Sequence, residues 1–266
     1  MTRASLVLAL SLMPTTTFAQ WINYPVSGTP RTKNGKANLA APAPKAKNGR
    51  PDLSGLWTSV RPAADTREPN ANSGVGPDIR SYIEPPNEPP VLLPEAAALF
   101  QQRYETFGAG RPSESCLPHS IPDMMLVGRP FKVVQNPNLT LILYEFATRY
   151  RQILTDGRSH PTDMDPAWFG YSTGKWEGGT FVVDTRGFNN KSWLDDVGHP
   201  HTDALHTIER FRRLDFGHMT MEVTIDDPKS YRRPWTATVH FSLIPDSELI
   251  EDICENEKDS AHAVGK

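Results

Sequence analysis

Short runs of alternating apolar and polar side chains fill the chain from Phe131 onward, and a period of two residues is that of a β-strand. The runs are rich in β-branched and aromatic residues and are separated by turn signals such as Asp156-Gly157 and Phe216-Gly217. Strands are expected within residues 139–147, 149–157, 171–178, 180–188, 206–215, 218–227, 235–244 and 247–256.

This pattern predicts a mainly β fold, a single antiparallel up-and-down barrel of about eight to ten strands, because closure removes exposed sheet edges. A two-sheet sandwich is the competing architecture. Alternation also assigns faces: in the segment 206–215, His206 and Glu209 lie on opposite sides of a regular strand. These two side chains can act together only if a bulge or the start of the strand intervenes.

One helix is predicted before the strands, over residues 94–107. Its spacing of three and four residues defines an apolar stripe, and Pro94 and Gly108 suit its start and its end. The stripe comprises Ala96, Leu99, Phe100, Arg103, Tyr104 and Phe107. We expect an amphipathic helix that lies against the sheet or closes a barrel end. The Pro- and Asn-rich residues 61–93 are predicted to form a long surface loop.

The first residues have the pattern of a signal peptide. A basic start, the apolar run 4–13 and the small-residue end Thr17-Phe18-Ala19 predict that residues 1–19 are removed. Residues 20–50 contain an internal repeat, in which 30–40 is echoed by 44–54, and we interpret them as an extended tether rich in Pro, Lys, Asn and Gly. The barrel domain is expected over 51–258 and a disordered tail over 259–266.

The composition of the chain limits the classes of binding partner that we expect. A formal net charge of −3 with 22% charged residues offers no basic excess for nucleic acid or anionic lipid. The longest apolar run is well short of the roughly 20 residues that span a bilayer. We therefore expect a soluble periplasmic or secreted protein with a small-molecule substrate or ligand. The sequence does not indicate an oligomeric state.

Two cysteines, Cys116 and Cys254, are present. In an oxidising compartment they could form one disulfide that joins the segment before the strands to the C-terminal end, and two unpaired thiols are the alternative.

Several stretches resemble a widespread family of exported bacterial proteins that usually have no assigned function. The matching motifs are PDLSGLW, DGRSHP, GKWEGGTFVVDTRGFN, WLDDVGHPHTDALHTIERFRR and DPKSYRRPW. The residues most characteristic of the family pattern are Asp156, Gly157, Arg158, His160 and Pro161, followed by Pro200, His201, Leu205, His206, Glu209 and Arg210. Gly179 departs from the pattern, since an Asp is more typical there. The resemblance covers roughly residues 44–256 and implies a one-domain barrel, lipocalin-like in outline, without an activity.

His199, His201 and His206 form an H-x-H-x4-H array, and imidazoles this close in sequence can meet one divalent metal ion. A fourth ligand could come from His160, Asp163, Asp165 or Glu209. Pro200 restricts the backbone between the first two histidines, and loop histidines without a metal are the alternative.

Acid–base chemistry without a metal needs only a histidine and a carboxylate in a partly dry pocket. The catalytic candidates are His201, His206, His160, Glu209, Asp196 and Arg151, and the candidates for substrate binding are Arg158, Trp168, Tyr171 and Trp193. For each of them a structural role, such as an ion pair, a turn or core packing, is the alternative.

Two functions follow from these residues. The first is an exported enzyme of the lyase, isomerase or hydrolase type that acts on a small organic substrate, with or without one divalent metal ion. The second is a periplasmic carrier whose lipocalin-like barrel holds an apolar or aromatic molecule. The chain has no glycine-rich nucleotide-binding pattern, so we expect no nucleotide cofactor.

Overall fold

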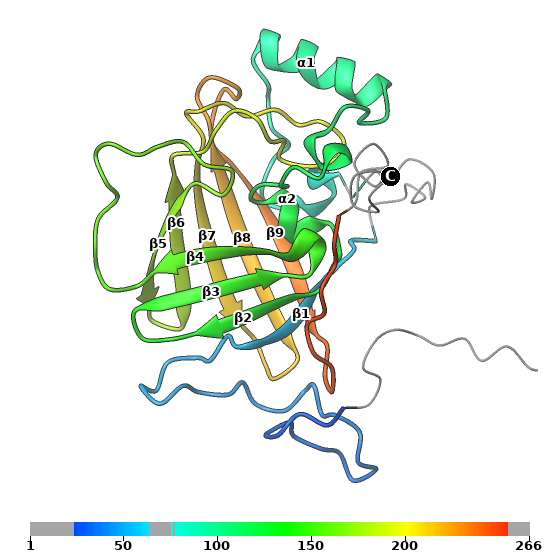
Figure 1. Ribbon diagram of the computed structural model, residues 1–266, viewed down its shortest axis with the longest axis vertical. Coiled ribbons are helices and arrows are strands. Elements are labelled where there is room, and N and C mark those ends of the chain that lie inside the picture. The colour runs from blue at the N-terminus through cyan, green and yellow to red at the C-terminus, as the bar shows by residue number, and fades with distance from the viewer. Residues whose placement is uncertain (1–23, 64–75, 77, 255–266) are drawn as a thin grey trace, which may run out of the picture.

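The computed structural model describes residues 24–63, 76 and 78–254. Their nine strands follow one another around a closed barrel, and the last strand pairs with the first (Figure 1). The strands are β1 Gly55–Val60, β2 Phe131–Gln135, β3 Leu139–Tyr144, β4 Arg149–Leu154, β5 Tyr171–Glu177, β6 Thr180–Arg186, β7 His206–Arg213, β8 His218–Asp226 and β9 Trp235–Leu243. The predicted single β-barrel is confirmed.

The proposed signal peptide (1–19) and tail (259–266) lie outside the described residues. Within the described part of the chain, no helix has the length and apolar character needed to span a membrane.

One seam of the barrel departs from the predicted antiparallel order. The strands β4 and β5 pair in parallel, with Ile153 opposite Ser172 and Leu154 opposite Thr173. Residues 155–170 carry the chain back along the outside, so β5 starts at the same end of the barrel as β4. The expectation of a wholly antiparallel sheet is therefore wrong at this seam.

Strand alternation fills the barrel interior. In β9, Trp235, Ala237, Val239, Phe241 and Leu243 are all buried, as the two-residue period requires. They join one core with side chains from the other strands, among them Trp57, Phe131, Ile142, Ile153, Phe181, Val183, Phe211, Met221 and Val223. The interior is thus packed with side chains.

A cap covers one end of the barrel. It is built from the described residues 61–63, 76 and 78–130 of the insertion between the neighbouring strands β1 and β2, and from the loop 187–205 between β6 and β7 (Figure 1). The cap contains α1, Pro94–Glu105, and the short α2, Asp123–Leu126. Phe100 of α1 stacks on His199 of the loop with ring centroids 4.2 Å apart, which joins the two parts of the cap.

The predicted helix exists but differs from expectation in its end and its burial. It stops at Glu105, and Phe107 and Gly108 follow with positive φ angles of 54° and 72°. Only Ala96 and Phe100 of the predicted apolar stripe are buried, whereas Phe107 is 76% exposed. The helix rests on cap loops, which cover fewer of its side chains than a sheet would.

Each copy of the internal repeat forms the same small loop. In the first copy the amide of residue 32 donates to the carbonyl of 36, 35 to 32, and 38 to 30; in the second copy 46 donates to 50, 49 to 46, and 52 to 44. The segment is also attached to the barrel, because Phe216 and Gly217 donate to the carbonyls of Ala41 and Leu39. It is therefore a folded strap at the end of the barrel opposite the cap, not a free extended tether.

The last predicted strand, 247–256, is wrong over its described part, since residues 247–254 have no strand pairing. β1 and β9 already close the barrel, so this β-like sequence has no free edge to join.

Substitution of Gly198, in the cap, is expected to lower the stability of the folded protein strongly. Its φ is +113°, and a Cβ there would lie 2.4 Å from the Cβ of Arg103. Gly198→Ala should lower the free energy of unfolding by about 2 kcal/mol or more, measured by urea denaturation. Gly178→Ala is the matched control, because Gly178 has a φ of +59° but nothing within 4 Å. An equal loss in both variants would show that contact with Arg103 has no part in the effect.

Candidate functional site

The candidate residues lie in three separate places: the outer face of the barrel, its interior and the cap. On the outer face, Nε2 of His206 lies 3.0 Å from Oδ1 of Asp184. Nε2 of His160 lies 3.5 Å from the same oxygen and 3.2 Å from the main-chain oxygen of Asp184. The turn after β4 supplies His160, β6 supplies Asp184 and the start of β7 supplies His206. The structure therefore brings two predicted catalytic histidines to one carboxylate.

Asp184 fixes the tautomer of both rings. Its main-chain carbonyl accepts from His160 and its carboxylate from His206, so the Nε2 atom of each neutral imidazole carries the proton. Nδ1 of each ring is then the atom with a free lone pair, which a general base requires. The side chains of His160, His206 and Asp184 are 18%, 22% and 34% exposed, so the three are sheltered but accessible.

A surface groove of about 350 Å³ lies beside this group. Its lining includes Arg158, His160, Lys175, Asp184, Ile208 and Arg210. The ring of the predicted binding residue Tyr171 meets the His160 ring edge-on at 5.9 Å. Arg158 is paired with Asp156 at 2.5 Å and Arg210 with Glu177 at 2.9 Å, which compensates part of their charge. The groove thus brings His160 and Asp184 together with guanidinium groups that could hold a polar substrate, and His206 reaches it only through its bond to Asp184.

Arg151 and Glu209 form an ion pair inside the barrel and are not part of the groove. Their side chains are 1% and 0% exposed, with Nη2 and Oε2 2.5 Å apart and Nη1 and Oε1 2.9 Å apart. Arg151 also donates to the hydroxyls of Ser172 and Thr185 at 3.1 and 2.8 Å. The prediction that His206 and Glu209 face opposite sides of one strand is confirmed. Arg151 also lines a second pocket of about 200 Å³, which it shares with Tyr171 and Ser172, and the catalytic role of Arg151 and Glu209 stays a prediction.

His201 lies in the cap, paired with a serine. The hydroxyl of Ser192 lies 2.7 Å from Nε2 of His201, and Nδ1 lies 3.0 Å from the carbonyl of Thr202. Since a carbonyl only accepts, Nδ1 carries the proton and Nε2 accepts from Ser192. Both residues are buried, so this pair holds the loop rather than facing a substrate.

Burial lowers the pKa of His201 below its ordinary value of 6.5, against the opposing effects of the Thr202 carbonyl and Asp227. The folded protein then binds this proton less tightly than the unfolded chain, so stability is lost as pH falls from 6.5 toward the folded pKa. His201→Gln should reduce the loss of urea resistance between about pH 7 and about pH 5. A loss as large as that of the wild type would exclude this role for His201.

The remaining candidate aromatic residues also pack in or against the cap. The guanidinium of Arg103 lies 4.3 Å from the ring centre of Trp193, which is buried. The main-chain carbonyl of Trp168 accepts from the Ser120 hydroxyl at 2.5 Å. Neither tryptophan lines the groove, so their predicted role in substrate binding is not supported.

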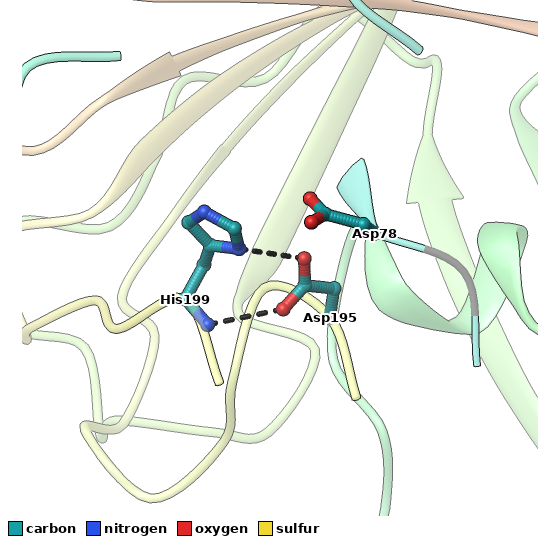
Figure 2. Close-up of side chains that lie close together, drawn as sticks. All are labelled: Asp78, Asp195 and His199. Atoms are coloured by element: carbon teal, nitrogen blue, oxygen red, sulfur yellow. Dashed lines mark hydrogen bonds and ion pairs between the residues drawn. The ribbon is translucent and has the colours of Figure 1, made fainter. Parts of the chain in front are cut away.

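Next to these residues, Asp78, Asp195 and His199 form a buried group (Figure 2). Nδ1 of His199 lies 2.7 Å from Oδ2 of Asp195, which also accepts from the amide of Ile79. Oδ1 of Asp195 accepts from the amides of residues 198 and 199, and Asp78 is paired with Arg80. The carboxylates of this group are satisfied by the chain itself.

A second buried group consists of His119, Asp123 and the predicted catalytic Asp196. Burial, and then the charge of Asp123, raises the pKa of Asp196 to about 7. Burial opposes protonation of His119, but the charge and hydrogen bond of Asp123 outweigh it and raise the pKa of His119 to about 9. The residues that contact these two buried groups are not the residues that line the groove.

The predicted H-x-H-x4-H metal array is not one site. His199 pairs with Asp195, His201 with Ser192 and His206 with Asp184. Among the described residues, two groups place three donor atoms within 4.8 Å of one another, and neither contains His201 or His206. The loop directs His199 and His201 into the cap, whereas His206 starts β7 on its outward face.

The sequence did not single out several residues that the structure places in these groups. In the sequence, Asp184 occupies an ordinary exposed position of a predicted strand. Its only distinguishing feature is that it lies on the same outward face of the sheet as His206 of the neighbouring strand β7. Asp78 falls in the predicted surface loop 61–93, and His119 and Asp123 fall after the predicted helix 94–107 in a segment for which the sequence predicts no element.

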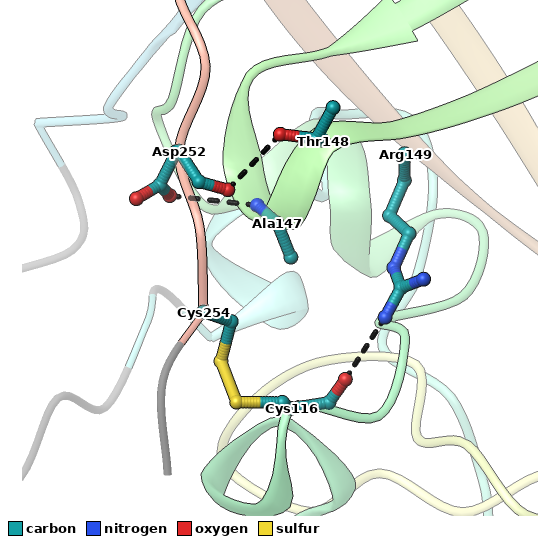
Figure 3. Close-up of a disulfide and its surroundings, with 6 residues drawn as sticks. All are labelled: Cys116, Ala147, Thr148, Arg149, Asp252 and Cys254. Atoms are coloured by element: carbon teal, nitrogen blue, oxygen red, sulfur yellow. Dashed lines mark hydrogen bonds between the residues drawn. A yellow bond between two sulfur atoms is a disulfide. The ribbon is translucent and has the colours of Figure 1, made fainter. Parts of the chain in front are cut away.

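The disulfide between Cys116 and Cys254 is present and joins residues 138 positions apart (Figure 3). Next to it, Asp252 accepts from the amide of Ala147 at 3.4 Å and the hydroxyl of Thr148 at 3.1 Å. The bridge therefore attaches the C-terminal segment to the cap, and the hydrogen bonds of Asp252 attach it to the barrel just after the end of strand β3.

No protein-family model matches this chain, and a search of curated proteins finds no match either.

Proposed function

We propose that this protein is an exported enzyme that acts on a small polar organic substrate by acid–base chemistry in the groove beside Asp184. One observation carries the proposal: two histidines contact one aspartate, Asp184, which lines an open groove together with the first of them, His160, while the second, His206, bonds to the Asp184 carboxylate. Held as Nε2–H tautomers, the rings of His160 and His206 present Nδ1 as proton acceptors. One removes a proton and the other, once protonated, returns one, as elimination, isomerisation and hydrolysis all require.

Export is supported by the leader pattern of residues 1–19 and by the disulfide, which is typical of an oxidising compartment. A periplasmic or secreted location is therefore part of the proposal.

The enzyme is favoured over a lipocalin-like carrier by the barrel interior. A carrier of this type holds its ligand among the inward-facing side chains. Here those positions contribute to one packed core, and the Arg151–Glu209 pair occupies polar space within it. The groove lies on the outer face, so binding there does not need the interior.

The test is a panel of small ester, elimination and isomerisation substrates, assayed with wild type and with His160→Gln and His206→Gln. Loss of a general acid or base should lower kcat/KM by about 100- to 10,000-fold. His218→Gln is the matched control, since His218 pairs with Asp215 at 2.8 Å on the surface outside the groove. Turnover that survives both groove variants, or no turnover of any substrate class, would contradict the proposal.

A further inference from the structure

Two cationic side chains share one carboxylate in the lining of the groove. Nζ of Lys175 lies 2.8 Å from Oε1 of Glu177, and Nη1 of Arg210 lies 2.9 Å from its Oε2. The hydrogen bond from Lys175, and then that from Arg210, lowers the pKa of Glu177 below its ordinary value, so this carboxylate is ionised at neutral pH. One negative charge faces two positive charges, and the three side chains together carry one positive charge in excess.

The register of the sheet places the two cations on either side of one apolar residue. Val182 of β6 lies opposite Lys175 of β5 and opposite Arg210 of β7. Side chains of directly opposite residues lie on the same face of a sheet, and all three of these line the groove. Glu222, which lies opposite Arg210 on β8, is not part of the groove lining. This part of the groove is therefore a valine flanked by an ammonium and a guanidinium group.

The adjacent row of the same face contains the residue that contacts both histidines. Thr173, Asp184 and Ile208 lie opposite one another on β5, β6 and β7, and all three line the groove. Asp184 and Val182 are two residues apart on β6, a spacing of about 7 Å. The groove thus has its acid–base group in one row and its excess positive charge in the next, within the length of one small molecule.

We infer that the groove selects an anionic substrate, a small organic acid whose carboxylate is held between Lys175 and Arg210 and whose apolar carbons contact Val182. A carboxylate accepts charge-assisted hydrogen bonds from both cations. Arg158, the third cation of the lining, is already paired with Asp156 at 2.5 Å, so the excess charge belongs to the other two. This inference rests on the proposed function, because it names the substrate class of the same groove. Lys175 and Arg210 act in it as binding residues that determine specificity.

The test compares butanoate with butanamide, which are nearly equal in size and differ in charge. Their binding to the full-length protein is measured by NMR titration at low salt. Butanoate should bind about fivefold more tightly than butanamide, the size of effect that exposed charge pairs give. A salt concentration of about 1 M should remove most of this preference, because exposed charges are screened.

Lys175→Gln and Arg210→Gln should each weaken butanoate binding about two- to fivefold and leave butanamide binding unchanged. Lys229→Gln is the matched control, because Lys229 pairs with Asp203 at 2.7 Å on the surface outside the groove. This control variant should bind both compounds as the wild type does.

Equal binding of butanoate and butanamide to wild type, or the same preference in wild type, Lys175→Gln and Arg210→Gln, would overturn the inference. Binding of these compounds is measured without turnover, so the result is separate from the test of the proposed function. The variant His160→Gln should lose activity and still prefer butanoate. A preference for butanoate in a protein that turns over no substrate class would contradict the proposed function while supporting the anion site.

Discussion

Glu209→Leu should lower the free energy of unfolding by about 3–5 kcal/mol, measured by urea denaturation, because it leaves the Arg151 guanidinium charged and unpaired inside the barrel. The two side chains are 1% and 0% exposed, so water cannot replace the lost carboxylate. The hydroxyls of Ser172 and Thr185 contact the same guanidinium but carry no charge to compensate it.

The double variant Arg151→Met with Glu209→Leu is the control for this effect. It removes both charges, and replacement of a buried pair by apolar side chains is often neutral or stabilising. It should therefore recover most of the stability that Glu209→Leu loses. A single variant that costs less than about 1 kcal/mol would contradict the buried, unscreened pair.

Cys116→Ala with Cys254→Ala should lower the free energy of unfolding by about 2–5 kcal/mol. The bridge closes a loop across 138 positions, so its loss gives the unfolded chain much more freedom. The described C-terminal segment has few other attachments, among them Asp252 to Thr148 and Lys132 to Glu248. Hydrogen exchange should therefore increase most in residues 247–254.

Wild type under reducing conditions is the control for the cysteine variants. It should show the same drop in urea midpoint as the double variant, since both lack the bridge. Equal midpoints for oxidised wild type and the double variant would show that the bridge adds no stability.

Much of the fold was predictable because strand alternation is a local signal. The alternation of β7 separated His206 from Glu209, which the structure places on opposite faces of the strand. The parallel pairing of β4 with β5 was not predictable, because both strand directions share the two-residue period. Residues 247–254 have a strand-like composition but pair with no strand. The reason is that β1 and β9 already close the barrel, which the local sequence does not reveal.

The candidate site was predictable only in part. His160 and His206 attract attention as residue types, but Asp184, which contacts both, comes from β6. It meets His206 through the pairing of β6 with β7 and meets His160 through the path of the loop after β4. Asp196 was a candidate from its acidic loop, whereas its partners His119 and Asp123 are more than seventy positions away in the sequence. These buried groups of the cap form because the insertion between β1 and β2 crosses the end of the barrel. No local sequence pattern specifies that path.

In the proposed mechanism, Asp184 holds two histidines ready for proton transfer, His160 through its main-chain carbonyl and His206 through its carboxylate. A long-range proton–nitrogen NMR spectrum, recorded with neutral imidazoles, measures which ring nitrogen carries the proton. In wild type the protons of His160 and His206 should both be on Nε2. Asp184→Asn should mix the tautomers of His206, while His160, which keeps the main-chain carbonyl of residue 184, and His218 should stay unchanged. Protonated Nδ1 atoms in wild type, or identical spectra for wild type and Asp184→Asn, would contradict the account.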